Sequence, residues 1–394
     1  MDWNKIYSSR MERVKPSAIM ELIKVLGRKK VINFASGLPD ASLFPTHDLK
    51  EIQDLVLQED GAGALQYGPA EGYLPLREWV AEDLHQKGVP ASANNILITH
   101  GSQQAIDLVA RILLEPEDLL VLETPTYLAA LQAFDSYGVL YRVVPMDGNG
   151  MRTSRLAGLL GSGKVKLIYT LPNYQNPTGI TMSSERREEL VQISQRYGVP
   201  ILSDEAYIDL RYDGDELPML HKLGKSSNVI STGTFSKTIV PGIRVGWVVA
   251  PEEVVEKLSQ VKQITDLHSN SFAQRVVHRY CKGGKLPAQI ERLRSAYRGK
   301  RDALLGALDK YFYGLGEWHR PSGGMFMLIR LYGGGRADEI LKRALDEGVA
   351  FVPGASFFPD GGGGDTIRLN FVSPPLGDIE DGVKRLAQVV KESK

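Results

Sequence analysis

Short apolar runs rich in β-branched residues alternate with longer amphipathic segments through the middle of the chain. The expected strands are Ile96–Thr99, Leu119–Leu122, Lys166–Leu171, Ile201–Ser203, Val229–Ser231 and Trp247–Ala250. The helix-like segments between them are Ser102–Leu114, Tyr127–Tyr137, Ser184–Tyr197 and Glu252–Gln263. Strands that are apolar on both faces and separated by helices are typical of a parallel sheet buried on both sides. The alternation therefore predicts an α/β domain with a mainly parallel central sheet flanked by helices.

The alternation stops near residue 285, where a long charged helix is expected over Gln289–Tyr311. An apolar strand at Met325–Ile329 follows, then a helix, a strand and a final helix over Asp378–Lys391. This order predicts a smaller α+β unit. The first 45 residues have no evident place in the parallel sheet. We therefore expect a large domain over residues 46–284 and a small domain made of residues 1–45 and 285–394.

The 47 basic and 47 acidic residues of this 394-residue chain cancel, so no overall field favours nucleic acid or an anionic membrane. The helix from Gln289 carries several arginines, but acidic residues among them favour a solvated face over a nucleic-acid stripe. A single cysteine, Cys281, excludes an internal disulfide framework and favours a reducing, cytoplasmic location. The amino terminus lacks the apolar core of a signal peptide, and no apolar run approaches the roughly 18 residues of a membrane span.

The segment Thr234-Phe-Ser-Lys-Thr-Ile-Val-Pro-Gly-Ile-Arg244 places Lys237 among hydroxyl groups and an arginine. An amine attacks carbonyls only when it is deprotonated, which a desolvated, cation-rich setting favours. The hydroxyls of Thr234 and Ser236 and the guanidinium of Arg244 also resemble half of a phosphate-binding cup. These groups together predict a lysine imine to a phosphorylated aldehyde, which is pyridoxal phosphate. For the lysine taken alone, the alternative is a solvated side chain in a polar loop.

A second candidate phosphate-binding segment, His100-Gly-Ser-Gln-Gln-Ala105, follows an expected strand and opens a helix. The free N–H groups of a helix start bind anions, and the hydroxyl of Ser102 adds a donor. Ser102 is alternatively an ordinary helix N-cap. Because Thr234, Ser236 and Arg244 supply further donors, we favour the phosphate ligand.

A pyridine ring needs a carboxylate on its nitrogen, donors on its phenolic oxygen and a face to stack on. Asp204 ends an apolar strand, where ligand groups gather in open α/β sheets, and there it can keep the ring nitrogen protonated. Tyr207, three residues on, and Asn176, in a tight turn after another strand, are candidate donors to the ring oxygen. Tyr127 is a candidate stacking aromatic, with a core tyrosine as the alternative.

The order of these residues resembles that of the class I/II (fold type I) aminotransferases. The ordered set is Ser102, Tyr127, Asn176, Asp204, Tyr207, Lys237 and Arg244. Phe34-Ala-Ser-Gly-Leu-Pro-Asp40 and Leu65-Gln-Tyr-Gly-Pro-Ala-Glu-Gly72 extend the resemblance over nearly the whole chain. The chain is most similar to the subgroup of 2-aminoadipate, kynurenine and aromatic amino acid aminotransferases. The resemblance implies the fold of type I pyridoxal-phosphate transferases and transfer of an α-amino group to a 2-oxo acid in two half-reactions.

The resemblance also implies a role for each matching residue. Lys237 would bind the cofactor aldehyde and then shuttle a proton, and Asp204 would pair with the ring nitrogen. Asn176 and Tyr207 would contact the ring oxygen, and Tyr127 would stack on the ring. Phosphate would be held by Ser102, Gln103, Thr234, Ser236 and Arg244. Tyr67 would reach the phosphate of a neighbouring subunit, so the resemblance implies a homodimer with shared active sites.

Two further residues match the part of the family's site that binds the substrate. Arg368, in Thr366-Ile-Arg-Leu-Asn370, would clamp the α-carboxylate by a bidentate pair, although taken alone it would be an ordinary surface arginine. Gly37 would leave room for that carboxylate.

The substrate is indicated by Met20, which stands where the aminoadipate enzymes carry an arginine for the distal carboxylate. A thioether packs on aromatic and aliphatic groups but does not pair with a carboxylate. We therefore expect aromatic or large apolar amino donors, with 2-oxoglutarate as the acceptor. Arg10 and Arg13 lie nearby in the sequence and remain available to an acidic acceptor.

Several alternatives stay open. One is a 2-aminoadipate-type aminotransferase. Another is a β-lyase or decarboxylase, because the reaction depends on which Cα bond stands perpendicular to the cofactor ring. A remote one is the ligand-sensing domain of a transcription regulator, which we disfavour because the chain shows no DNA-binding segment. No metal is expected, since His278 and Cys281 are joined by no further ligands.

Overall fold

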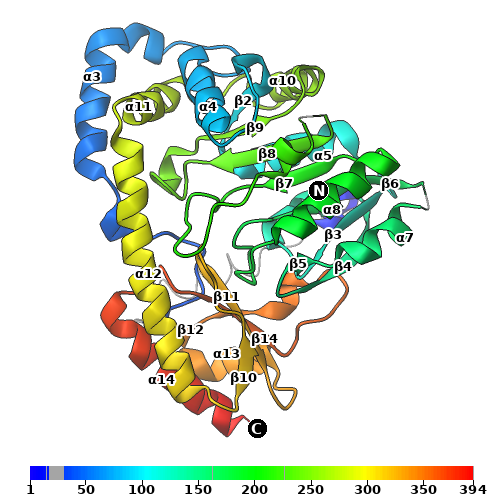
Figure 1. Ribbon diagram of the computed structural model, residues 1–394, viewed down its shortest axis with the longest axis vertical. Helices are drawn as coiled ribbons and strands as arrows, with labels where there is room; N and C mark the ends of the chain where they lie inside the picture. The colour runs from blue at the N-terminus through cyan, green and yellow to red at the C-terminus, as the bar shows by residue number, and fades with distance from the viewer. Residues whose placement is uncertain (15, 17–30, 162, 226, 394) are drawn as a thin grey trace.

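The computed structural model describes residues 1–14, 16, 31–161, 163–225 and 227–393. Its centre is an eight-stranded sheet in the order β2-β9-β8-β7-β6-β3-β4-β5 (Figure 1). The strands in that order are β2 (Ile96–Thr99), β9 (Gly246–Val249), β8 (Val229–Thr234), β7 (Ile201–Asp204), β6 (Val165–Thr170), β3 (Leu119–Thr124), β4 (Leu140–Asp147) and β5 (Gly150–Met151). Neighbouring strands from β8 to β4 are parallel, whereas β9 runs antiparallel to both β8 and β2. As a result β2 points the same way as β8.

Both faces of this sheet are buried, because successive side chains of a strand point to opposite sides. On β3, Leu120 and Leu122 join one apolar cluster, and Leu119 and Val121 join another. The first cluster includes side chains from α5 (Gly101–Leu113), α6 (Leu128–Asp135) and α10 (Glu252–Asp266). The second includes side chains from α7 (Leu156–Leu160) and α8 (Ser184–Tyr197). Among the described strands, those from β2 to β3 therefore offer no exposed face on which polar side chains could gather, and only the outer strand β4 is partly exposed.

A third apolar cluster covers the end of the sheet formed by β2 and β9. It contains side chains from α3 (Thr46–Ala64), α4 (Leu74–Gln86) and α11 (Ser271–Lys282). In Figure 1 these three helices lie together beside β2. Two short helices, α1 (Arg10–Arg13) and α9 (Leu220–Leu223), lie outside this group.

A second, smaller unit contains an antiparallel sheet in the order β10-β11-β14-β13. Its strands are β10 (Gly316–Trp318), β11 (Phe326–Leu331), β14 (Thr366–Asn370) and β13 (Val352–Pro353). Towards the amino terminus β1 (Ile32–Asn33) pairs in parallel with β12 (Val349–Ala350), which connects this early segment to the smaller unit. Helices α13 (Ala337–Asp346) and α14 (Ile379–Glu392) accompany this sheet, and α12 (Lys285–Tyr311) runs along both units in Figure 1. The division at residues 45 and 285 stays a prediction.

The fold class expected from the sequence is confirmed: a mostly parallel central sheet flanked by helices, with a smaller α+β unit. All six expected strands are present, but β4 was missed. Its side chains are largely exposed or half-buried and it contains Pro145, so it lacks the apolar run of a central strand. Within the described part of the chain, no helix is both long enough and apolar enough to cross a membrane.

We predict that His221 makes stability depend on pH. Its side chain is buried on α9, its Nδ1 atom has no hydrogen-bond partner, and burial lowers its pKa from 6.5 to about 4. Because the folded-state pKa is depressed, the folded protein keeps His221 neutral. The stability that depends on this neutral form is fully present above pH 6.5 and is lost as pH falls towards 4. Between pH 7.5 and 5 the wild type should lose about 2 kcal/mol of unfolding free energy that a His221→Leu variant keeps.

Urea unfolding at the two pH values measures this difference. The His221→Leu variant is itself the reference, because it keeps every other titratable group of the wild type. Equal pH dependence in the wild type and His221→Leu would refute the prediction.

Candidate active site

Polar residues meet at one edge of the large sheet, where β2, β3, β6, β7 and β8 end and the antiparallel β9 begins. A pocket opens at this edge. Its lining residues are Ser102, Gln103, Tyr127, Leu171, Asp204, Ala206, Tyr207, Thr234, Ser236, Lys237, Pro241 and Arg244. Most of the residues expected to bind the cofactor are therefore brought together, although they are spread over more than 140 positions of the sequence.

Hydroxyl and guanidinium groups form one part of the pocket wall. Thr234 Oγ1 donates to Ser236 Oγ at 2.9 Å, and Arg244 Nη1 donates to the same Ser236 oxygen at 3.2 Å. Arg244 Nη2 also donates to the carbonyl of His100 at 3.1 Å, at the start of α5. His100 is the N-cap of α5 and Ser102 is its second residue, so the N-cap alternative for Ser102 is wrong.

Gly101 allows this close approach of helix and guanidinium. It adopts φ +74°, a conformation that residues with a side chain rarely take. A Cβ atom at this position would also lie 2.6 Å from Arg244 Nη2. The first N–H groups of α5, which have no partner within the helix, therefore lie beside Arg244, as an anion site requires.

Asp204 is the last residue of β7 and is almost completely buried. Its Oδ1 accepts from the Ala206 N–H at 3.2 Å, and its Oδ2 accepts from the Tyr169 hydroxyl at 3.0 Å. Burial raises the pKa of Asp204 to about 6, and the two hydrogen bonds oppose that rise. The carboxylate thus stays mostly ionised at neutral pH in a site where a protonated ring nitrogen can reach it. Tyr169 was not identified from the sequence.

Lys237 points into the pocket from the turn after β8. Its Nζ donates to the carbonyl of Gly37 at 3.3 Å and lies 6.0 Å from the ring centre of Tyr207. Burial, together with the charge of Arg244, lowers the pKa of Lys237 to about 8. A substantial fraction of this amine is therefore neutral at physiological pH, as nucleophilic attack on an aldehyde requires.

Tyr127, Tyr207 and Asn176 lie around the same space. Tyr127 lies just before α6, and burial raises its pKa to about 12, so its hydroxyl stays protonated. Burial also raises the pKa of Tyr207, whose hydroxyl is hydrogen-bonded to the side chain of Asn176. Asn176 lies in the loop after β6 and is buried.

The loop that carries Asn176 is held by a buried acid that the sequence analysis did not identify. Glu123 accepts from Thr170 Oγ1 at 2.5 Å and from Gln175 Nε2 at 3.3 Å. Gln175 Nε2 also donates to the carbonyl of Pro125 at 2.7 Å. No motif in the sequence marks Glu123. Its contact with this loop depends on the pairing of β3 with β6, which the sequence does not show.

Arg368 of β14 is a buried cation without a carboxylate partner among the described residues. Its Nη2 donates to the carbonyl of Ala35, its Nη1 donates to Asn176 Oδ1 at 3.4 Å, and its Nε has no partner. The rings of Phe326 and Phe357 lie 4.5 Å and 5.2 Å from the guanidinium carbon. The surface-arginine alternative is therefore wrong. A buried charge is normally paired, so this one is available to an anionic ligand.

Three further predicted residues do not line this pocket. Tyr67 is 77% exposed, and its ring lies in a T-shaped arrangement with that of His268, with ring centres 5.6 Å apart. Met20 lies outside the described residues. Arg10 lies over the ring of Tyr137, and Arg13 lies against Gly138, beyond the carboxyl end of α6. The structure therefore brings neither arginine to the pocket that contains Lys237.

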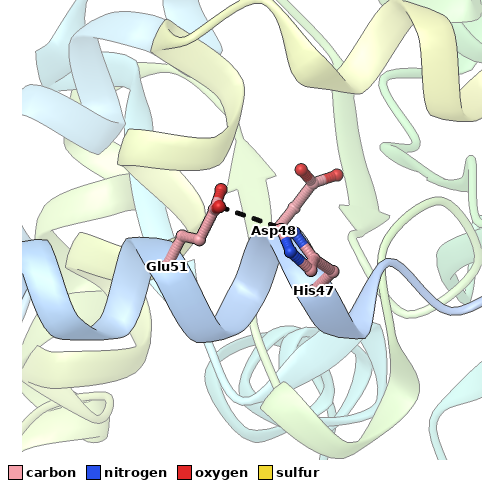
Figure 2. Close-up of side chains that lie close together, drawn as sticks. All are labelled: His47, Asp48 and Glu51. Atoms are coloured by element: carbon pink, nitrogen blue, oxygen red, sulfur yellow. Dashed lines mark ion pairs between the residues drawn. The ribbon is translucent and has the colours of Figure 1, made fainter.

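Within the described part of the chain, one group of side chains has the spacing of metal ligands, namely His47, Asp48 and Glu51 at the start of α3 (Figure 2). His47 Nδ1 lies 3.6 Å from Glu51 Oε1, and Asp48 pairs with Lys285 Nζ at 2.5 Å. His47 and Glu51 are exposed. These surface ion pairs account for the cluster, and we assign it no metal.

The pocket residues fit a phosphorylated pyridine aldehyde. The hydroxyls, the guanidinium and the start of α5 suit a phosphate, and the buried carboxylate of Asp204 suits a protonated ring nitrogen. An amine with a lowered pKa suits the aldehyde. The fold and the site together define an α/β enzyme of the pyridoxal-phosphate type.

Comparison with known proteins specifies the family. A family model described as aminotransferase class I and II matches residues 29–386. Aromatic-amino-acid aminotransferase 1 of Thermococcus litoralis is 39% identical over 398 residues, covering 100% of this chain and 95% of that protein.

Two solved structures are also similar. Kynurenine aminotransferase of Pyrococcus horikoshii, in complex with PMP and kynurenine, has a TM-score of 0.95 at 38% identity. The match covers 99% of this chain and 98% of that chain. α-Aminoadipate aminotransferase LysN of Thermus thermophilus, complexed with N-(5'-phosphopyridoxyl)-L-leucine, has a TM-score of 0.93 at 37% identity, with coverage of 100% and 99%. The chain belongs to the class I and II aminotransferases, and its cofactor is pyridoxal phosphate. The family, fold type and cofactor expected from the sequence are confirmed.

We predict that Lys237 of the cofactor-free protein titrates with a midpoint near pH 8, because burial and Arg244 disfavour its protonated form. In an Arg244→Gln variant the midpoint should rise, since a neighbouring cation is lost. The pH dependence of acetylation at Lys237, followed by peptide mass spectrometry, measures both values. Exposed lysines of the same digest are the internal reference. The same midpoint in wild type and Arg244→Gln would contradict the electrostatic role of Arg244.

Proposed function

We propose that this aminotransferase takes aromatic and large apolar amino acids as donors and 2-oxoglutarate as the acceptor. The observation that carries the proposal is Arg368, a buried cation that has no acidic partner among the described residues and lies 4.5 Å and 5.2 Å from the ring centres of Phe326 and Phe357. Such a position favours an α-carboxylate followed by an apolar side chain. The names of the relatives support it, since one is an aromatic-amino-acid aminotransferase and another was solved with a leucine adduct.

The polar residues of the site are assigned different parts in holding the cofactor. We assign the phosphate to Ser102, Gln103, Thr234, Ser236 and Arg244. Asp204 would accept from the ring nitrogen, and Asn176 and Tyr207 would bind the ring oxygen. Tyr127 would lie against the face of the ring. When bound, pyridoxal phosphate supplies an electron sink that makes the substrate Cα–H bond acidic.

The chain's own residues then orient the substrate and move one proton. Arg368 would bind the α-carboxylate through two N–H groups, which fixes the orientation of the Cα bonds. Gly37, whose carbonyl accepts from Lys237, would leave space beside that carboxylate. Lys237 Nζ, whose pKa burial lowers to about 8, would in its neutral form accept the Cα proton and deliver it to C4′ of the cofactor. The reaction in the second half would run in reverse with the 2-oxo acid.

A 2-aminoadipate donor is the second candidate, and the Thermus thermophilus neighbour favours it by name. A distal carboxylate would need a cation beyond Arg368. Among the described residues, the two arginines considered for this role, Arg10 and Arg13, lie against Tyr137 and Gly138. The apolar donor is therefore the better supported choice.

A donor screen tests the proposal. With 2-oxoglutarate as acceptor, phenylalanine, tyrosine, tryptophan, kynurenine, leucine and methionine should each give at least about tenfold higher kcat/KM than 2-aminoadipate, since a carboxylate in an apolar pocket stays unpaired. Lys237→Ala is the control and should lose nearly all turnover with every donor. A preference for 2-aminoadipate would contradict the assignment. Ammonia and pyruvate as products would instead indicate a lyase.

We further propose that the enzyme is a homodimer with shared sites and is cytoplasmic. Tyr67 lies in a surface cleft with Leu65 and His268, and Leu65, Tyr67 and Leu267 are all more than half exposed. Ile264, on α10, is 83% exposed. Exposed apolar side chains gathered in this way are typical of a protein interface. The single Cys281 is buried and free, which favours a reducing compartment.

Co-expression of two variants tests the shared site. We expect Lys237→Ala dimers to be inactive and Tyr67→Ala dimers to bind cofactor weakly. A mixed dimer contains one intact site, because Tyr67 of the first variant completes the site that holds Lys237 of the second. At limiting cofactor the mixture should regain about a quarter of wild-type activity, the share of intact sites in a random C2 assembly. No recovery, or a monomer in sedimentation equilibrium, would refute the proposal.

A further inference from the structure

Tyr169 is a fully buried tyrosine that lies directly behind the pocket. It is on β6, and its register partner on β7 is Leu202. Asp204 is two residues beyond Leu202, so its side chain lies on the same face of the sheet as that of Tyr169. The phenol spans this diagonal, and its hydroxyl donates to Asp204 Oδ2 at 3.0 Å. The ring also packs against that of Phe134 in a T-shaped arrangement, with ring centres 5.3 Å apart.

We infer that Tyr169 is a positioning residue that keeps the Asp204 carboxylate ionised and directed towards the ring nitrogen of the cofactor. The inference rests on the role proposed above for Asp204. It extends that role to Tyr169, which does not line the pocket.

The protonation of the buried Asp204 carboxyl depends on opposing effects of its surroundings. Burial and the neighbouring charge of Glu205 raise its pKa, whereas the hydrogen bonds from Tyr169 and from the Ala206 N–H lower it. Burial and Asp204 raise the pKa of Tyr169 well above its ordinary value, so the phenol remains a donor at every working pH. Without this donor more of the carboxyl would be protonated at neutral pH. A protonated carboxyl does not stabilise a protonated ring nitrogen.

The donor also limits the orientation of the carboxylate. With Oδ2 bound to Tyr169 and Oδ1 bound to Ala206, rotation about the last side-chain bond would break both contacts. The remaining lone pairs of the two oxygens are the ones available to a ligand. Phenylalanine would fill the same volume, so the hydroxyl is needed for the carboxylate and not for packing.

The experiment compares two ligands of the cofactor-free protein. Pyridoxamine phosphate forms no bond to Lys237, and its carbocyclic analogue has a C–H group in place of the ring nitrogen. Tyr169→Phe should weaken binding of pyridoxamine phosphate about tenfold, the usual effect of a hydrogen bond to a charged group. Binding of the analogue should change less than about twofold, because it makes no contact that depends on ionised Asp204.

The matched control is Tyr141→Phe, which removes a tyrosine hydroxyl bound to Asp135 at 2.6 Å on the same sheet but outside the pocket. It should leave both dissociation constants unchanged. Equal weakening of both ligands by Tyr169→Phe would show a structural role and overturn the inference, as would no weakening at all. Asp204→Asn tests the proposed role of Asp204 itself. If this variant also changes the binding of pyridoxamine phosphate and of its analogue equally, the proposed role of Asp204 is wrong as well.

Discussion

A sheet whose two faces are both buried can present polar side chains only where its strands end. On β7, Ile201 and Leu202 are fully buried on opposite faces, and Asp204 stands at the end of the strand. The same constraint applies to β2, β3, β6 and β8, whose ends lie at one edge. The location of the pocket thus follows from the burial of the sheet. Its chemistry depends on which side chains follow each strand.

The pocket contains more positive charge than its own acids balance. Arg244 and Arg368 both disfavour the ammonium form of Lys237, and Asp204 opposes them. This imbalance costs stability in the free protein, since a buried charge is normally paired. It also makes the amine reactive, and it is relieved when a phosphate and a substrate carboxylate bind. Strong ligand binding and a lowered lysine pKa therefore have the same electrostatic origin.

The sequence predicted the strands with continuous apolar runs and the polar residues that follow them. It did not predict β4, because that strand is partly exposed. It also did not predict the direction of β9, because the periodicity of apolar residues does not depend on strand direction. It also missed Tyr169, whose contact with Asp204 spans 35 positions and exists only because β6 lies beside β7 in one register. Tyr67 shows the opposite case. Its motif was visible in the sequence, but a single chain leaves it exposed.

The adjacent acids Asp204 and Glu205, at the end of β7, have different partners. Asp204 faces the pocket, whereas Glu205 accepts from Asn173 Nδ2 at 2.6 Å. Asn173 in turn accepts from the buried Arg187, which donates to the carbonyls of Pro172 and Met182 at 3.0 Å and 2.9 Å. These two carbonyls lie at opposite ends of the loop that carries Asn176, so one guanidinium closes the loop. The carboxylate assigned to the ring nitrogen and the amide assigned to the ring oxygen are thus positioned from the same strand end.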